Sequence, residues 1–235
     1  VAAGRFAALG TNAWRVAPAL LDAVARGDMS IGVPAARALA GMNIDQAPHW
    51  ERLAGRLAGQ TRAVRVLEWL VRGSDEWRRP YSLANRRFGL LGLGAVGPAA
   101  KPTAPMVVEL LKSRDDSGLW PAAVSALVGM KADTPELLSG FKRVLQNPEE
   151  WPTTRACAAD ALTALAPGDP NLRPLLDSAL RDTSGLVRAA AARNLWKLHV
   201  SPAVVLPVLT ALLDHKLVSI RTVALDGLAQ MGAAA

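Results

Sequence analysis

The sequence predicts an all-α fold, a right-handed superhelix of about six stacked helix pairs. The first observation behind this prediction is a fixed period near the carboxyl end. Matching residues there lie 33 positions apart, among them Pro174 with Pro207 and Arg188 with Arg221. The second observation is that each 33-residue unit carries two apolar helical patterns. A period of this length with two helices per unit indicates helix pairs that stack on each other and share no central core.

Composition agrees with an all-helical chain. Hydrophobic residues make up 51% of the 235 residues, yet Phe and Tyr number only 3 and 1. The buried surface must therefore consist largely of Ala, Leu and Val, which suits closely packed helices. The single cysteine, Cys157, excludes an internal disulfide and a cysteine-based zinc site, and we expect it to be a small buried side chain.

No apolar run reaches the about 18 to 20 residues that a membrane helix needs, so we expect no membrane contact. We expect a cytoplasmic monomer. An upstream signal or anchor before Val1 stays open, because the sequence begins without Met.

The amino-terminal part predicts helices of less regular spacing. Residues 11–27 predict a helix, and residues 30–42 predict its partner, in which Pro34 is tolerated only in the first turn. Residues 48–72 predict two further helices that are separated at Gly59.

A polar stretch at residues 73–87 then interrupts the helical pattern and predicts a long loop, which in a compact array is usually functional or disordered. Residues 51–100 hold a local excess of five positive charges. Arginines interleaved with aromatic residues can hold phosphate and stack bases. The candidate contact residues in this stretch are Trp77, Arg78, Arg79, Tyr81, Arg86 and Arg87.

Residues 86–235 predict regular helix pairs whose first helices begin at or beside a proline. We interpret residues 1–235 as a single repeat domain, irregular over 1–85 and regular over 86–235. The glycine-rich stretch GLLGLGAVG follows no strand, so we expect its glycines to let two helix backbones approach closely.

The segment 94–112, GAVGPAAKPTAPMVVELLK, resembles the passage from one repeat to the next in the HEAT-repeat family. SGLVRAAAARNLWKL and VSIRTVALDGLAQMG resemble the second helix of such repeats. The resemblance implies a HEAT-like α-solenoid whose second helices line a groove. It also implies a ladder between neighbouring repeats, here from Asp182 and Asp214 with Arg188 and Arg221.

No arrangement of residues points to an enzyme or to a cofactor. The three His are widely spaced, and none has a second ligand at metal-binding distance on its helix face. Trp196 stands where the other repeats hold small residues, so we place it with Arg193 on the groove side, together with Trp120, as contact positions for a bound protein.

We therefore expect a noncatalytic scaffold that binds another protein or a peptide. The alternative is nucleic-acid binding through the Arg-rich segment 52–87, including the narrower case of a HEAT-like DNA glycosylase. A third possibility is a HEAT-like chromophore lyase, which would need a bilin-binding acid or Cys in the groove.

Overall fold

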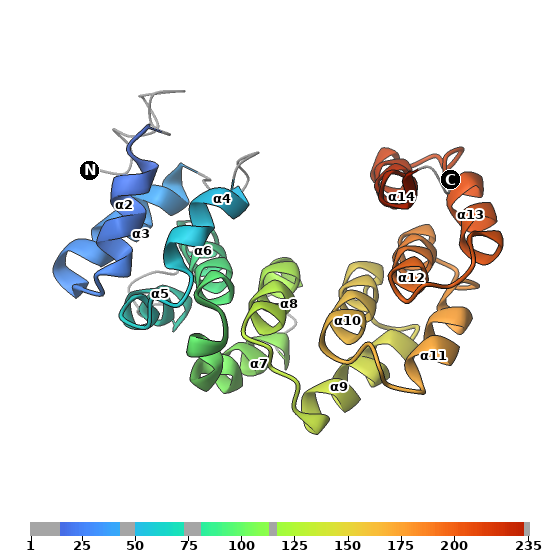
Figure 1. Cartoon of the computed structure of the whole chain (residues 1–235), viewed down its shortest axis with the longest axis horizontal. Helices are drawn as coiled ribbons and strands as arrows, with labels where there is room; N and C mark the ends of the chain where they lie inside the picture. The colour runs from blue at the N-terminus through green and yellow to red at the C-terminus, as the bar shows by residue number, and fades with distance from the viewer. Residues whose placement is uncertain (1–14, 43–49, 73–80, 113–116, 233–235) are drawn as a thin grey trace. The chain divides into compact units, whose positions relative to one another are not determined.

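A computed structural model describes residues 15–42, 50–72, 81–112 and 117–232. Every regular element in these ranges is an α-helix or a short 3-10 helix, and none is a strand. The prediction of an all-α fold is therefore confirmed (Figure 1).

The chain divides into two compact units, Val1–Ala132 and Asp133–Ala235, here called unit one and unit two. This boundary lies well after residue 85, where the sequence pattern changes from irregular to regular. The helices that follow residue 85 are therefore shared between both units.

Unit one has α6 at its centre, where it packs against α3, α5 and α8. Around this helix, α2 pairs with α3, and α7 packs against α8. The elements of unit one are α2 (Ala17–Ala25), α3 (Met29–Gly41), α4 (Trp50–Ala54), η3 (Gly55–Leu57), α5 (Ala63–Arg72), α6 (Tyr81–Val96), η5 (Gly97–Thr103), α7 (Ala104–Lys112), η6 (Ser117–Leu119) and α8 (Trp120–Gly129).

Glycines explain how closely the helices of unit one pack. A Cβ atom placed on Gly129 of α8 would lie 2.3 Å from the carbonyl oxygen of Gly94 of α6. Since real Cβ atoms do not come so near a backbone oxygen, only glycine allows this crossing. The expectation that GLLGLGAVG permits close backbone approach is confirmed.

Two sequence-based expectations about unit one are wrong. Pro34 does not lie in a first turn, because α3 already begins at Met29, where Asp28 caps it by accepting a hydrogen bond of 2.8 Å from the Ser30 amide. The expected loop does not extend to residue 87, because α6 begins at Tyr81. Tyr81, Arg86 and Arg87 are therefore helical residues.

Unit two consists of three helix pairs. Figure 1 shows α10, α12 and α14 in one row, with α9, α11 and α13 in a second row beside it, and the contacts between successive helices agree. The elements of unit two are α9 (Pro135–Gln146), α10 (Pro152–Leu165), α11 (Leu172–Ala179), α12 (Gly185–Lys197), α13 (Pro202–Ala211) and α14 (Val218–Met231).

The helices α10, α12 and α14 begin at Pro152, Gly185 and Val218, which are spaced 33 residues apart. An arginine three residues into each helix binds the turn before it. The Nε atom of Arg155 donates to the Glu150 carbonyl at 3.2 Å, and Nη1 of Arg188 donates to the Asp182 carbonyl at 2.8 Å. The corresponding nitrogen of Arg221 donates to the His215 carbonyl at 2.8 Å.

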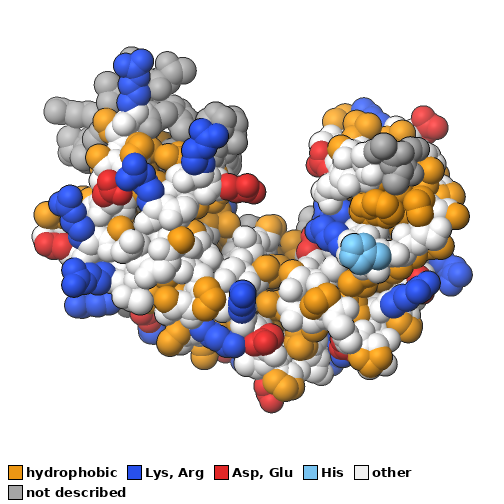
Figure 2. Space-filling view, viewed as in Figure 1, with side chains coloured by type: hydrophobic (Ala, Val, Ile, Leu, Met, Phe, Trp, Pro, Cys, Tyr) orange, Lys and Arg blue, Asp and Glu red, His pale blue; other side chains and the backbone are white. Residues whose placement is uncertain are grey.

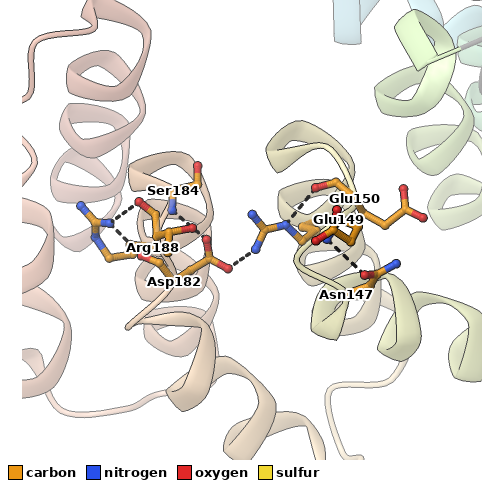
Figure 3. A network of polar contacts seen from close by, with 8 residues as sticks. Asn147, Glu149, Glu150, Asp182, Ser184 and Arg188 are labelled. Atoms are coloured by element: carbon orange, nitrogen blue, oxygen red, sulfur yellow. Dashed lines mark hydrogen bonds and ion pairs between the residues drawn. The ribbon is translucent and has the colours of Figure 1, made fainter.

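One carboxylate joins two neighbouring helix pairs. Asp182 pairs through its carboxylate with Arg155 of the preceding helix pair and accepts a hydrogen bond of 2.8 Å from the Ser184 amide (Figure 3). Arg188 donates to backbone oxygens of this turn and not to the Asp182 carboxylate. The ladder expected of Asp182 and Asp214 with Arg188 and Arg221 is therefore not formed by those residues, because Asp182 pairs with Arg155, and Asp214 is exposed and holds no ion pair within the described chain.

Candidate functional site

Arg193, a predicted contact residue of unit two, belongs to a polar cluster between α10 and α12. Nη2 of Arg193 donates to both carboxylate oxygens of Asp160, each at 2.7 Å, and the Asn194 amide nitrogen donates to the same carboxylate at 2.7 Å. Asn194 is fully buried, and its side-chain oxygen has no hydrogen-bond partner within the described residues. Arg193 is therefore used to hold α12 against α10.

Trp196 connects the next two helices of the same row. Its indole nitrogen donates to the Gln230 carbonyl of α14 at 3.3 Å, and its ring is half-buried. The indole of Trp196 thus contributes to the contact between α12 and α14. Arg193 and Trp196 lie one turn apart on α12, and each contacts a neighbouring helix of the row.

Cys157 lies beside this polar cluster and is a free, half-buried thiol. Burial raises the pKa of the Cys157 thiol to about 11, and the nearby Asp160 carboxylate adds to the increase. The thiol is therefore protonated at neutral pH and is a poor nucleophile. The side chain, which we expected to be buried, is only partly covered.

The remaining predicted contact residues divide into two groups. Trp120 begins α8 with 8% of its surface exposed, so it offers little area to a partner. The Nε atom of Arg86 donates to the Val71 carbonyl at 3.2 Å, and Arg87 is half-buried in the same helix. Trp77, Arg78 and Arg79, and the side chain of Tyr81, lie outside the described residues.

An exposed apolar surface on α14 was not predicted from the sequence. Figure 2 shows hydrophobic side chains gathered around α13 and α14. The large exposed ones are Val204, Leu217, Val218 and Leu225. We call Val218, Thr222 and Leu225 the outer face of α14, because they lie three or four residues apart on one side of the helix.

The two preceding helices of the row show why this outer face is unusual. The residues 33 and 66 positions before Leu225 are Ala192 and Ala159, and both are fully buried, whereas Leu225 is 55% exposed. Val218 is 65% exposed, while its counterpart Gly185 is covered by the side chains of Ile220 and Leu212. In α12 this face is therefore covered by the next helix pair, whereas in α14 no described residue covers Val218 and Leu225 in this way.

A signal for the outer face was present in the sequence. At the position of Ala159 and Ala192, α14 holds Leu225, which is a larger and more apolar residue. Comparison of the three helices position by position would have identified it.

Among the described side chains, no group of three or more His, Cys, Asp and Glu is placed to hold a metal ion. No helix in the described ranges combines the length and the apolar character needed to cross a bilayer.

Comparison with known protein families, with curated proteins and with solved structures found no match to this chain.

Proposed function

We propose that this protein is a noncatalytic scaffold that binds another protein through the outer face of α14, and that its helix pairs belong to a right-handed, HEAT-like α-solenoid. The observation that carries the proposal is the exposure of Leu225 and Val218 at positions that are covered in α12. Contiguous apolar surface on a folded protein is typical of a protein-binding site.

The chemistry of the partner follows from what covers the same face of α12. There, Ile220 of α14 and Leu212 at the end of α13 approach Gly185 closely, so that a Cβ atom on it would lie 3.1 Å from a methyl group of each. A helix or helix pair with branched aliphatic side chains on one face would cover α14 in the same way. The partner we propose is therefore an amphipathic helical segment of another protein.

The scaffold contributes a preformed surface to this contact. The helix α14 is held by α12 and α13, and its inner side chains Ile220, Ala224 and Met231 are buried. Since this helix is already ordered, binding costs it little conformational entropy, which favours affinity.

The polar cluster around Asp160 supports a noncatalytic role. Its carboxylate is bound by Arg193 and Asn194, and the neighbouring Cys157 is protonated at neutral pH because its pKa is raised. Groups that are paired in this way hold helices together, and they are not available as a base or a nucleophile.

Affinity capture from a source lysate tests the proposal when it compares three forms of the protein. The wild type and an Ile31→Glu control, which changes an exposed apolar residue of unit one, should retain the partner. Leu225→Glu should lose it, and the purified partner should bind this variant at least about tenfold more weakly in calorimetry.

An unchanged set of captured proteins with Leu225→Glu would refute the outer face as the binding site. Self-association of the wild type in sedimentation velocity, lost in Leu225→Glu, would replace the proposed partner by a second copy of this chain. Retention of the partner by Leu225→Glu but not by Trp196→Ala would move the site to the half-buried indole of α12.

A further inference from the structure

Unit one contains a cleft of about 300 Å³ between the end of α2, the short helix η3 and the turn at residues 58–62. The polar residues that line it are Asp22, Arg26, Arg56, Gln60, Thr61 and Arg62. The cleft thus brings three arginines from two separate segments to one place.

The backbone around the cleft is held on both sides. Gly27, which ends α2, has a φ of 73°, and a Cβ atom on it would lie 2.3 Å from the Arg62 carbonyl oxygen. The main chain of Arg62 therefore packs directly on the end of α2. On the other side, the Gly59 amide donates to the Val96 carbonyl of α6 at 2.9 Å. The turn that carries Arg62 is fixed at two points before any ligand binds.

The charges in the cleft are unbalanced. Asp22 is the one carboxylate among its lining residues, and it accepts from Nη1 of Arg56 at 2.7 and 2.8 Å. Arg26 and Arg62 are exposed, and neither forms a hydrogen bond or an ion pair through its side chain within the described residues. Two guanidinium groups therefore border the cleft with no protein anion to neutralise them.

We propose that this cleft binds a phosphate ester group. A guanidinium presents parallel N–H donors that match two oxygens of a phosphate, and two such groups at one cleft match its charge at neutral pH. Thr61 and Gln60 line the same cleft, and both residue types carry neutral hydrogen-bond donors. The volume lies at the low end of the range for ligand pockets, so the cleft fits one phosphate with the group attached to it.

Two ligands carry this chemistry: a small phosphorylated metabolite, and the phosphodiester backbone of a nucleic acid. The site lies in unit one and uses none of the residues of the outer face of α14. The two proposals are therefore independent, and the failure of one would not contradict the other.

The test measures binding of three probes at low salt: inorganic phosphate, a mononucleotide, and a fluorescent single-stranded oligonucleotide. The variant Arg26→Gln/Arg62→Gln should bind at least about tenfold more weakly than wild type. The control Arg143→Gln/Arg181→Gln removes the same charge from two exposed positions of unit two and should change affinity by less than about threefold.

A second variant should change the affinity for the probe in the opposite direction. Asp22→Asn removes the negative charge from the cleft and releases Arg56, so it should bind the probe about threefold or more tightly than wild type. Glu136→Gln, an exposed acid of unit two, should leave affinity nearly unchanged. Because the pair between Asp22 and Arg56 is nearly half exposed on both sides, its loss should not unfold the protein.

The three probes distinguish a small phosphorylated ligand from a nucleic-acid backbone. Binding of the mononucleotide, with competition by inorganic phosphate, assigns a small ligand, and binding of the oligonucleotide alone assigns a nucleic-acid backbone. The proposal is overturned if no probe binds, if the two double variants weaken binding equally, or if Asp22→Asn weakens it.

Discussion

The guanidinium of Arg155 on α10 is paired with the carboxylate of Asp182, which lies in the turn between α11 and α12. The two side chains are 5% and 13% exposed, so this pair between neighbouring helix pairs is almost fully removed from water. Asp182 also binds the Ser184 amide, and Arg155 also binds the Glu150 carbonyl. The pair therefore sets how one helix pair is placed on the next.

Removal of one partner of this pair should destabilise unit two strongly. In Arg155→Met, the Asp182 carboxylate is left buried without its counter-charge, which should lower the free energy of unfolding by about 3 kcal/mol or more. Urea denaturation followed by circular dichroism measures the change. The matched control is Arg173→Met, since Arg173 forms an exposed pair with Asp177 at 3.8 Å and should contribute less than about 1 kcal/mol.

The crossing of α6 and α8 should tolerate no side chain at Gly129. Gly129→Ala places a methyl group against the Gly94 backbone, and we expect a loss of about 2 to 3 kcal/mol because the two helices must separate. Gly140→Ala is the control, since nothing lies within 4 Å of its Cβ position inside α9. It should stabilise the protein by up to about 1 kcal/mol, because alanine is the better helix former. Equal effects in thermal unfolding would contradict the close crossing.

Equivalent positions of α12 and α14 should respond differently to the same charge. Ala192→Glu buries a carboxylate between α12 and α14 and should cost about 3 kcal/mol or more. Leu225→Glu, at the corresponding exposed position, should change stability by less than about 1 kcal/mol. Chemical denaturation of both variants checks this, and a large loss in Leu225→Glu would mean that the outer face of α14 is already covered in the isolated protein.

The Cys157 thiol should react slowly in the folded protein. With its pKa raised to about 11, the thiolate fraction at pH 8 is roughly 100-fold lower than in the unfolded chain, so modification by a disulfide reagent should be slower by a similar factor. Stopped-flow measurement with and without denaturant gives the two rates. Equal rates would show that the thiol is not desolvated as the structure indicates.

The same shift predicts a pH dependence of stability. A raised pKa in the folded state means that the unfolded chain loses its proton first. The stability contributed by protonated Cys157 is therefore complete below the unfolded pKa and is lost as the pH rises toward about 11. Cys157→Ala should remove this loss, and an unchanged alkaline profile in the variant would assign it to other groups.

The sequence predicted those features that depend on local patterns. Helices at α2, α3 and α5 follow from apolar spacing, and the start of α9 follows from the proline at its first position. It failed where neighbours outweigh local preference. Pro34 is accommodated in the middle of α3, and the polar residues from Tyr81 onward are helical as the first part of α6, which α3, α5 and α8 surround.

The candidate sites were predicted in a similarly uneven way. Trp196 was singled out because it differs from the residues at matching positions, and Arg193 because it was placed on the same side of the helix. Their contacts with Asp160 and Gln230 could not be read from one helix. The cleft beside Arg26 was anticipated only in part, since Arg56 and Arg62 belong to the Arg-rich segment 52–87 whereas Arg26 and Asp22 were not predicted. Its arginines come from segments about 30 residues apart, and only the packing of Gly27 on Arg62 brings them together.

By itself, the sequence determined that this protein is helical, that its carboxyl-terminal helices recur every 33 residues, and that glycine stands where two helices cross, because these properties depend on backbone preference and side-chain periodicity. Only the tertiary structure decided which side chains hold the helices together and which remain exposed for binding. Asp182 is bound by Arg155 and Asp22 by Arg56, while Leu225 and Arg62 are left exposed. The reason is that burial and charge pairing depend on which residues become neighbours in space, and distance along the chain does not specify this.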